Sequence, residues 1–109
     1  MEIQRIENMC GGNGHVFLKP ILNEKQLNGK CGLYAEVTLE PGCSLGYHEH
    51  HGRRRNLFTF FPEKEFTAIT ENFVWVEAGD MTFTPDGKGH ALTNAGEENL
   101  VFMALIILN

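Results

Sequence analysis

Apolar and polar residues alternate along much of this chain with a period of two. The pattern is clearest over residues 33–39, which read LYAEVTL. Successive side chains of a strand point to opposite faces, so this alternation predicts a strand with one buried face. Residues 73–76 and 100–108 are rich in apolar, β-branched and aromatic side chains and are also predicted to be strands.

Turn-forming residues separate these segments at short intervals. Glycine accompanied by Asn, Asp or Pro occurs at 28–29, 41–42, 78–80, 85–87 and 94–96, and such clusters favour tight turns. Only residues 23–27 have a sequence that suits a helical turn. Many short strands with almost no helix predict an all-β sandwich or closed barrel. Because the chain has 109 residues and no repeat or linker, we expect a single domain over residues 1–109.

The composition of the chain excludes several classes of protein and of binding partner. Hydrophobic residues make up 42% of the chain and charged residues 21%, which is ordinary for a globular protein and excludes a disordered one. The net charge of -5 argues against nucleic acid as a partner, because proteins that bind it carry a basic face. The longest apolar run, Leu100–Leu108, is too short for a membrane helix. With no signal peptide recognisable in MEIQRIENMC, we expect a cytoplasmic protein that does not bind a membrane.

The strand predicted after Pro41 and Gly42 carries an unusual polar sequence, YHEHH at residues 47–51. Alternation places His48 and His50 on one face of this strand and the neighbouring Glu49 and His51 on the other. Alternate residues lie about 7 Å apart, so two imidazoles on one face can reach a single metal ion. A bare HxH also occurs at solvated strand ends, and the motif alone does not decide between the two interpretations.

A third histidine strengthens the metal interpretation. His90 follows the turn at residues 84–89 and begins another predicted strand. A barrel that places this strand beside the first would complete a set of three imidazoles, since side chains from separate strands meet in a barrel interior.

The spacing of these residues resembles that of the cupins. The second cupin motif is met in full by Gly79, Pro85, Gly87, His90 and Asn94, whereas the first is met by Gly42, His48 and His50 and then stops. The resemblance, closest to the small single-domain bacterial cupins, implies a double-stranded β-helix (jelly-roll) barrel and a homodimer. It also implies a divalent metal held by His48, His50, His90 and a glutamate.

The glutamate is missing where the resemblance requires it. Residues 53–56 read RRRN, and an arginine cannot replace the carboxylate because it stays protonated. Two compensating frameshifts in the coding sequence would explain this departure. With one permitted choice of codons for residues 52–72, the shifted frame reads EEEEFIYIFSGKGIYSDNGK, which supplies acidic residues, an aromatic strand and a hairpin turn. We treat this as a hypothesis about residues 53–71.

Two functions remain open at this point. The first is a metal-dependent enzyme that acts on a small molecule, with His48, His50 and His90 holding Fe, Mn, Ni or Zn. The second is a non-catalytic module that binds or senses a small molecule or a metal. The sequence identifies no catalytic residue and no organic cofactor fingerprint. Trp75 and the phenylalanines are expected to pack the interior, because aromatic side chains dominate core burial.

Overall fold

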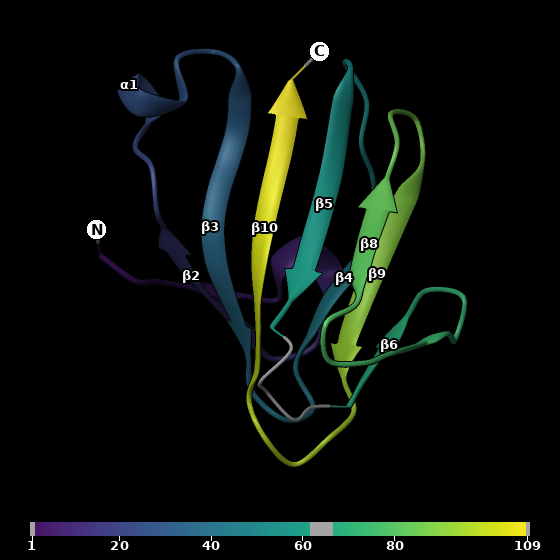
Figure 1. Cartoon of the computed structure of the whole chain (residues 1–109). Coiled ribbons are helices and arrows are strands. Elements are labelled where there is room, and N and C mark those ends of the chain that lie inside the picture. The colour runs from purple at the N-terminus through teal and green to yellow at the C-terminus, as the bar shows by residue number, and fades with distance from the viewer. Residues whose placement is uncertain (1, 62–66, 109) are drawn as a thin grey trace.

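A computed structural model describes residues 2–61 and 67–108, which form two antiparallel sheets (Figure 1). The six-stranded sheet has the order β1 (Gln4–Glu7), β2 (His15–Pro20), β3 (Cys31–Leu39), β10 (Leu100–Leu108), β5 (Arg54–Phe60) and β8 (Met81–Thr84). The four-stranded sheet has the order β4 (Ser44–Glu49), β9 (Gly89–Asn94), β6 (Ala68–Thr70) and β7 (Trp75–Val76).

The core lies between the two sheets and follows the predicted alternation. In β3, Val37 is opposite Phe102 of β10, and both are buried. Phe102 also packs against Phe60 of β5, with ring centroids 5.3 Å apart. The four-stranded sheet contributes Leu45 and Leu92 to the same cluster. The strands predicted over 33–39 and 100–108 are therefore confirmed, and their apolar faces hold the two sheets together.

Helical structure is confined to two short segments of the described chain, and neither is long and apolar enough to cross a membrane. The predicted helical turn is confirmed as α1 (Glu24–Leu27). It begins at Asn23, whose side chain accepts a hydrogen bond from the backbone N–H of Gln26, while the side chain of Gln26 accepts one from the backbone N–H of Asn23. This capping box satisfies two amides that the first turn leaves free. The second segment is the 3-10 turn η1 (Met9–Gly11), which the sequence pattern did not predict.

The segment predicted as a strand over 73–76 is shorter than expected. Phe73 has φ 58° and lies in the turn between β6 and β7, so only Trp75–Val76 is a strand. Val76 faces the core, whereas the side chain of Trp75 is 58% exposed and that of Phe73 is 81% exposed. The expectation that Trp75 packs the interior is wrong, because β7 is an edge strand whose two faces differ and Trp75 has the outward parity.

Strand pairing places the histidine segments side by side. β4 pairs with β9 in antiparallel register, and His48 lies opposite His90. β5 belongs to the other sheet, where Asn56 lies opposite Thr84 of β8. The HxH segment, the His90 strand and the arginine-rich segment therefore meet across one interior.

Candidate metal centre

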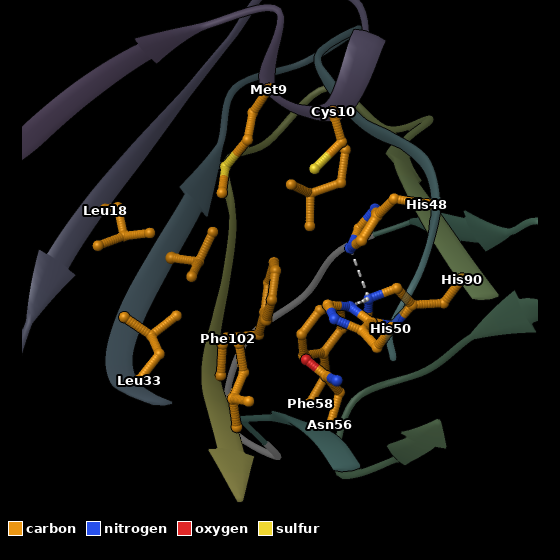
Figure 2. Close-up of a pocket in the computed structure, with 14 residues that line it drawn as sticks. Met9, Cys10, Leu18, Leu33, His48, His50, Asn56, Phe58, His90 and Phe102 are labelled. Carbon is orange, nitrogen blue, oxygen red and sulfur yellow. Dashed lines mark hydrogen bonds between the residues drawn. The ribbon is translucent and has the colours of Figure 1, made fainter. Parts of the chain in front are cut away.

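Three imidazoles meet between the sheets. His48 comes from β4, His50 follows the end of that strand, and His90 comes from β9. One ring nitrogen of each lies within 4.8 Å of the corresponding nitrogens of the other two. Figure 2 shows the three rings gathered at one side of a cavity. The structure thus brings together all the residues that the sequence predicted as metal ligands.

Hydrogen bonds at the Nδ1 atoms of His48 and His90, which lie away from the point where the rings meet, orient this cluster. The Nδ1–H of His48 donates to the carbonyl oxygen of Gly46 at 2.7 Å. Because a carbonyl can only accept, Nε2 of a neutral His48 carries the free lone pair. The Nδ1 atom of His90 lies 3.0 Å from the hydroxyl of Thr84. Partners of this kind fix the ring orientation of metal-binding histidines.

The separations between the inward nitrogens suit a shared ion. Nε2 of His90 lies 2.9 Å from Nε2 of His48 and 3.0 Å from Nε2 of His50. Ligands at right angles around an ion, each about 2.1 Å from it, are separated by about 3.0 Å. The histidine set therefore fits a divalent metal ion in both donor type and spacing.

Burial favours the neutral form of His90 and His50 by lowering the pKa of each. Burial, reinforced by the neighbouring His48 and His50, lowers the pKa of His90 to about 3. Burial also lowers the pKa of His50, with smaller contributions from His48, Arg54 and His51. A metal binds the neutral ring and competes with the proton, so these shifts favour metal binding at neutral pH.

Acidification is expected to destabilise the metal-free protein. The unfolded chain takes up a proton at the ordinary histidine pKa of 6.5, whereas folded His90 stays neutral until about pH 3. The free energy of unfolding therefore falls as the pH drops through this window, by at most about 1.4 kcal/mol per pH unit. From pH 7 to pH 4.5 we expect a loss of about 2 kcal/mol, measured by urea unfolding.

Two variants test whether His90 causes the loss of stability at low pH. His90→Leu should lose most of it, while His51→Ala, at an exposed position, should keep it. An identical pH dependence in His90→Leu and the unmodified protein would contradict the assignment.

The histidines stand at one end of a cavity of about 130 Å³. Its other walls are mainly apolar and come from Leu18, Leu33, Val37, Phe102, Ala104 and Ile106. The turn η1 adds Met9 and Cys10, whose side chains point into the cavity (Figure 2). A Cβ at residue 46 would lie 2.1 Å from the carbonyl oxygen of Cys10, so glycine at 46 lets η1 approach β4 closely.

Asn56 occupies the place where the cupin resemblance requires a glutamate. It lines the cavity with the three histidines and is 2% exposed, whereas Arg53, Arg54 and Arg55 are exposed. Its Nδ2 has no hydrogen-bond partner among the described residues. Asn56 was not among the predicted site residues, although the alternation that Asn56 shares with Phe58 and Phe60 would have placed its side chain inward.

The remaining histidines lie outside the cluster. His51 is exposed, and its Nε2 lies 3.3 Å from a carboxylate oxygen of the equally exposed Glu49. Both therefore point away from the cavity, as alternation predicted. The ring of His15 contacts the carboxylate of Glu40 instead.

Comparison with known proteins agrees with this architecture, although no family model matches the chain. The chain is 36% identical over 105 residues to the oxalate-binding protein of Thermotoga maritima, covering 96% of this chain and 86% of the relative. The crystal structure of a predicted oxalate decarboxylase from the same organism superposes with a TM-score of 0.89 at 34% identity, covering 100% of this chain and 94% of that one. The chain belongs to the cupin superfamily.

A more distant structure shows that the fold itself is shared. A cupin superfamily protein of Desulfitobacterium hafniense aligns with this cupin at a TM-score of 0.68 and 13% identity, covering 100% of this chain and 84% of that one. The two sheets are the double-stranded β-helix, or jelly roll, predicted from the motifs. The three-histidine group of this cupin fits the metal-binding members of the superfamily.

Proposed function

We propose that this cupin binds a divalent metal ion through His48, His50 and His90 and holds a small carboxylate beside that ion. The observation that carries the proposal is the convergence of three inward nitrogens within 4.8 Å of one another. Imidazole donors suit Fe, Mn, Ni and Zn. The ion would supply positive charge and open coordination positions, and the chain would supply orientation and an enclosed cavity.

The charge of the site favours an anionic ligand. The described residues that line the cavity include no Asp or Glu, so the three imidazoles leave the charge of a bound dication uncompensated. Arg54 adds positive charge close enough to act on His50. The relative from Thermotoga maritima is named an oxalate-binding protein. Oxalate is therefore the first carboxylate to test.

The small size of the cavity favours the binding of a small ligand over the turnover of a large substrate. Its volume of about 130 Å³ is smaller than the roughly 300–1,000 Å³ of pockets that enclose drug-sized molecules. A metal-dependent enzyme that acts on a small molecule is the second candidate, and the open space beside the histidine nitrogens supports it.

Calorimetric titration tests the proposal. Metal-free protein is titrated first with Mn²⁺, Ni²⁺ and Zn²⁺, and the loaded protein is then titrated with oxalate. We expect one ion per chain, and oxalate binding only in the loaded form, because the carboxylate binds next to the ion. Failure to bind any of these metals, or oxalate binding of equal strength without metal, would reject the proposal.

We further propose that residues 1–109 form a single cupin domain that associates as a homodimer in the cytoplasm. Large apolar side chains of the edge strands β7 and β8 support the dimer, because Trp75, Met81 and Phe83 are each more than half exposed. The molar mass in solution separates a dimer from a monomer.

A further inference from the structure

The buried amide of Asn56 points to an additional ligand contact. The side chain comes from β5 and lines the same cavity as His48, His50 and His90. It is 2% exposed, and its Nδ2 has no hydrogen-bond partner among the residues that the structure describes. Buried donors in folded proteins are nearly always paired, so an unpaired one beside a cavity calls for an acceptor within it. Figure 2 shows Asn56 on the same side of the cavity as His50.

The wall of the cavity that belongs to the same sheet as Asn56 has a different chemistry. Val37, Phe102, Ala104 and Ile106 lie along the two central strands of the larger sheet and present only hydrocarbon. Oxalate consists of two carboxylates, so it would satisfy the histidine end and leave these walls without an apolar partner. An apolar cavity of about 150 Å³ accommodates a ring as large as benzene. The volume of about 130 Å³ found in this cupin therefore has room for a short hydrocarbon chain.

We infer that the preferred ligand is a 2-oxo carboxylic acid with a short branched hydrocarbon chain. The inference rests on the metal and carboxylate binding proposed above. The carboxylate and the neighbouring oxo group form a chelating head that compensates the charge of the ion. A carboxylate oxygen accepts the hydrogen bond that the Nδ2 of Asn56 lacks, and a hydrogen bond to an ionised acceptor is among the stronger ones. The hydrocarbon chain lies against Val37, Phe102 and Ala104.

A ligand series on the unmodified, Mn²⁺-loaded protein tests the hydrocarbon part. The probes are 3-methyl-2-oxobutanoate, pyruvate, 3-methylbutanoate and oxalate. Pyruvate keeps the chelating head but has two carbons fewer, whereas 3-methylbutanoate keeps the branched chain but lacks the oxo group. We expect 3-methyl-2-oxobutanoate to bind at least about tenfold more tightly than pyruvate, given the gain for each buried methylene. We expect a similar advantage over 3-methylbutanoate, because that compound has no oxo group with which to chelate the ion.

The outcomes of this series separate the inference from the proposal on which it rests. Mn²⁺ binding with oxalate or pyruvate preferred over 3-methyl-2-oxobutanoate would overturn the inference and leave the proposed function standing. Absence of Mn²⁺ binding would overturn both.

The variant Asn56→Leu tests the amide contact, since leucine has a similar size and no donor. We expect the affinity for 3-methyl-2-oxobutanoate to fall about tenfold, while the affinity for Mn²⁺ and the melting temperature without ligand do not fall. Thr59→Val, on the outward face of the same strand, is the matched control and should bind the ligand unchanged. Unchanged ligand affinity in Asn56→Leu would overturn the contact, and so would a loss of Mn²⁺ affinity, which would make Asn56 a metal-holding residue instead.

Discussion

Replacement of His90 by alanine is expected to lower the affinity for divalent metal by about 100-fold or more. His90 is the central member of the cluster, because its Nε2 lies within 3.0 Å of the Nε2 atoms of both His48 and His50. Its removal leaves two imidazoles and water on one side of the ion. Losing a residue that merely supports a metal ligand already costs about 10- to 100-fold in affinity, so losing a ligand costs at least as much. Calorimetric titration with Zn²⁺ or Mn²⁺ measures the change.

Two controls separate ligand loss from unfolding. His51→Ala removes the exposed imidazole of the residue directly after His50 and should change the metal affinity less than about twofold. The circular dichroism spectrum of His90→Ala should retain the strand signal, because the hydrophobic residues that join the two sheets are unchanged in this variant. Equal metal affinity in His90→Ala and His51→Ala would contradict the assignment of the centre.

Substitution of Asn56 by glutamate is expected to tighten metal binding by about 10- to 100-fold. The new carboxylate would lie in the cavity with the three histidines, where its charge offsets that of the ion. The same carboxylate lacks a partner when no metal is bound, and a buried unpaired charge is costly. The melting temperature should therefore fall in the metal-free variant and rise above that of the unmodified protein when metal is added.

The matched control for this prediction is Asn56→Gln, which has the length of glutamate without its charge. It should not tighten metal binding. Similar metal affinities in the Glu and Gln variants would show that size, and not charge, acts at this position.

The frameshift hypothesis makes the same prediction for a longer replacement. In the shifted frame, EEEEFIYIFSGKGIYSDNGK replaces residues 53–72 and places a glutamate at 56, the position that the structure shows to be buried in the cavity. Residues 62–66 of this segment lie outside the described residues. The printed residues 68–70 form β6, and the turn follows them at 71–74. The Asp-Asn-Gly of the shifted frame would occupy 69–71 and would therefore begin two residues before the observed turn. Sequencing of the coding DNA decides whether the replacement is the natural sequence.

The sequence alone was sufficient for the strands over 33–39 and 100–108 and for the three histidines that meet. Period-two alternation in 33–39 reflects a chain that is buried on one face, so it predicts β3 without knowledge of its partners. The offsets of His48, His50 and His90 within the cupin motifs predicted which imidazoles meet, and their mutual distances agree. Alternation also placed Glu49 and His51 outside, because the parity of a strand is a local property.

Only the tertiary structure decided which other residues share the cavity with these histidines. Asn56 follows three arginines, and these charged residues hide the alternation that would place its side chain inward. It becomes an interior residue because β5 pairs with both β10 and β8. Met9 and Cys10 reach the cavity because η1 packs against Gly46, a contact between segments more than thirty residues apart. Trp75 is exposed because β7 is the edge of its sheet. A local pattern reports which side chains share a face, whereas the neighbours of that face depend on long-range pairing that the pattern does not encode.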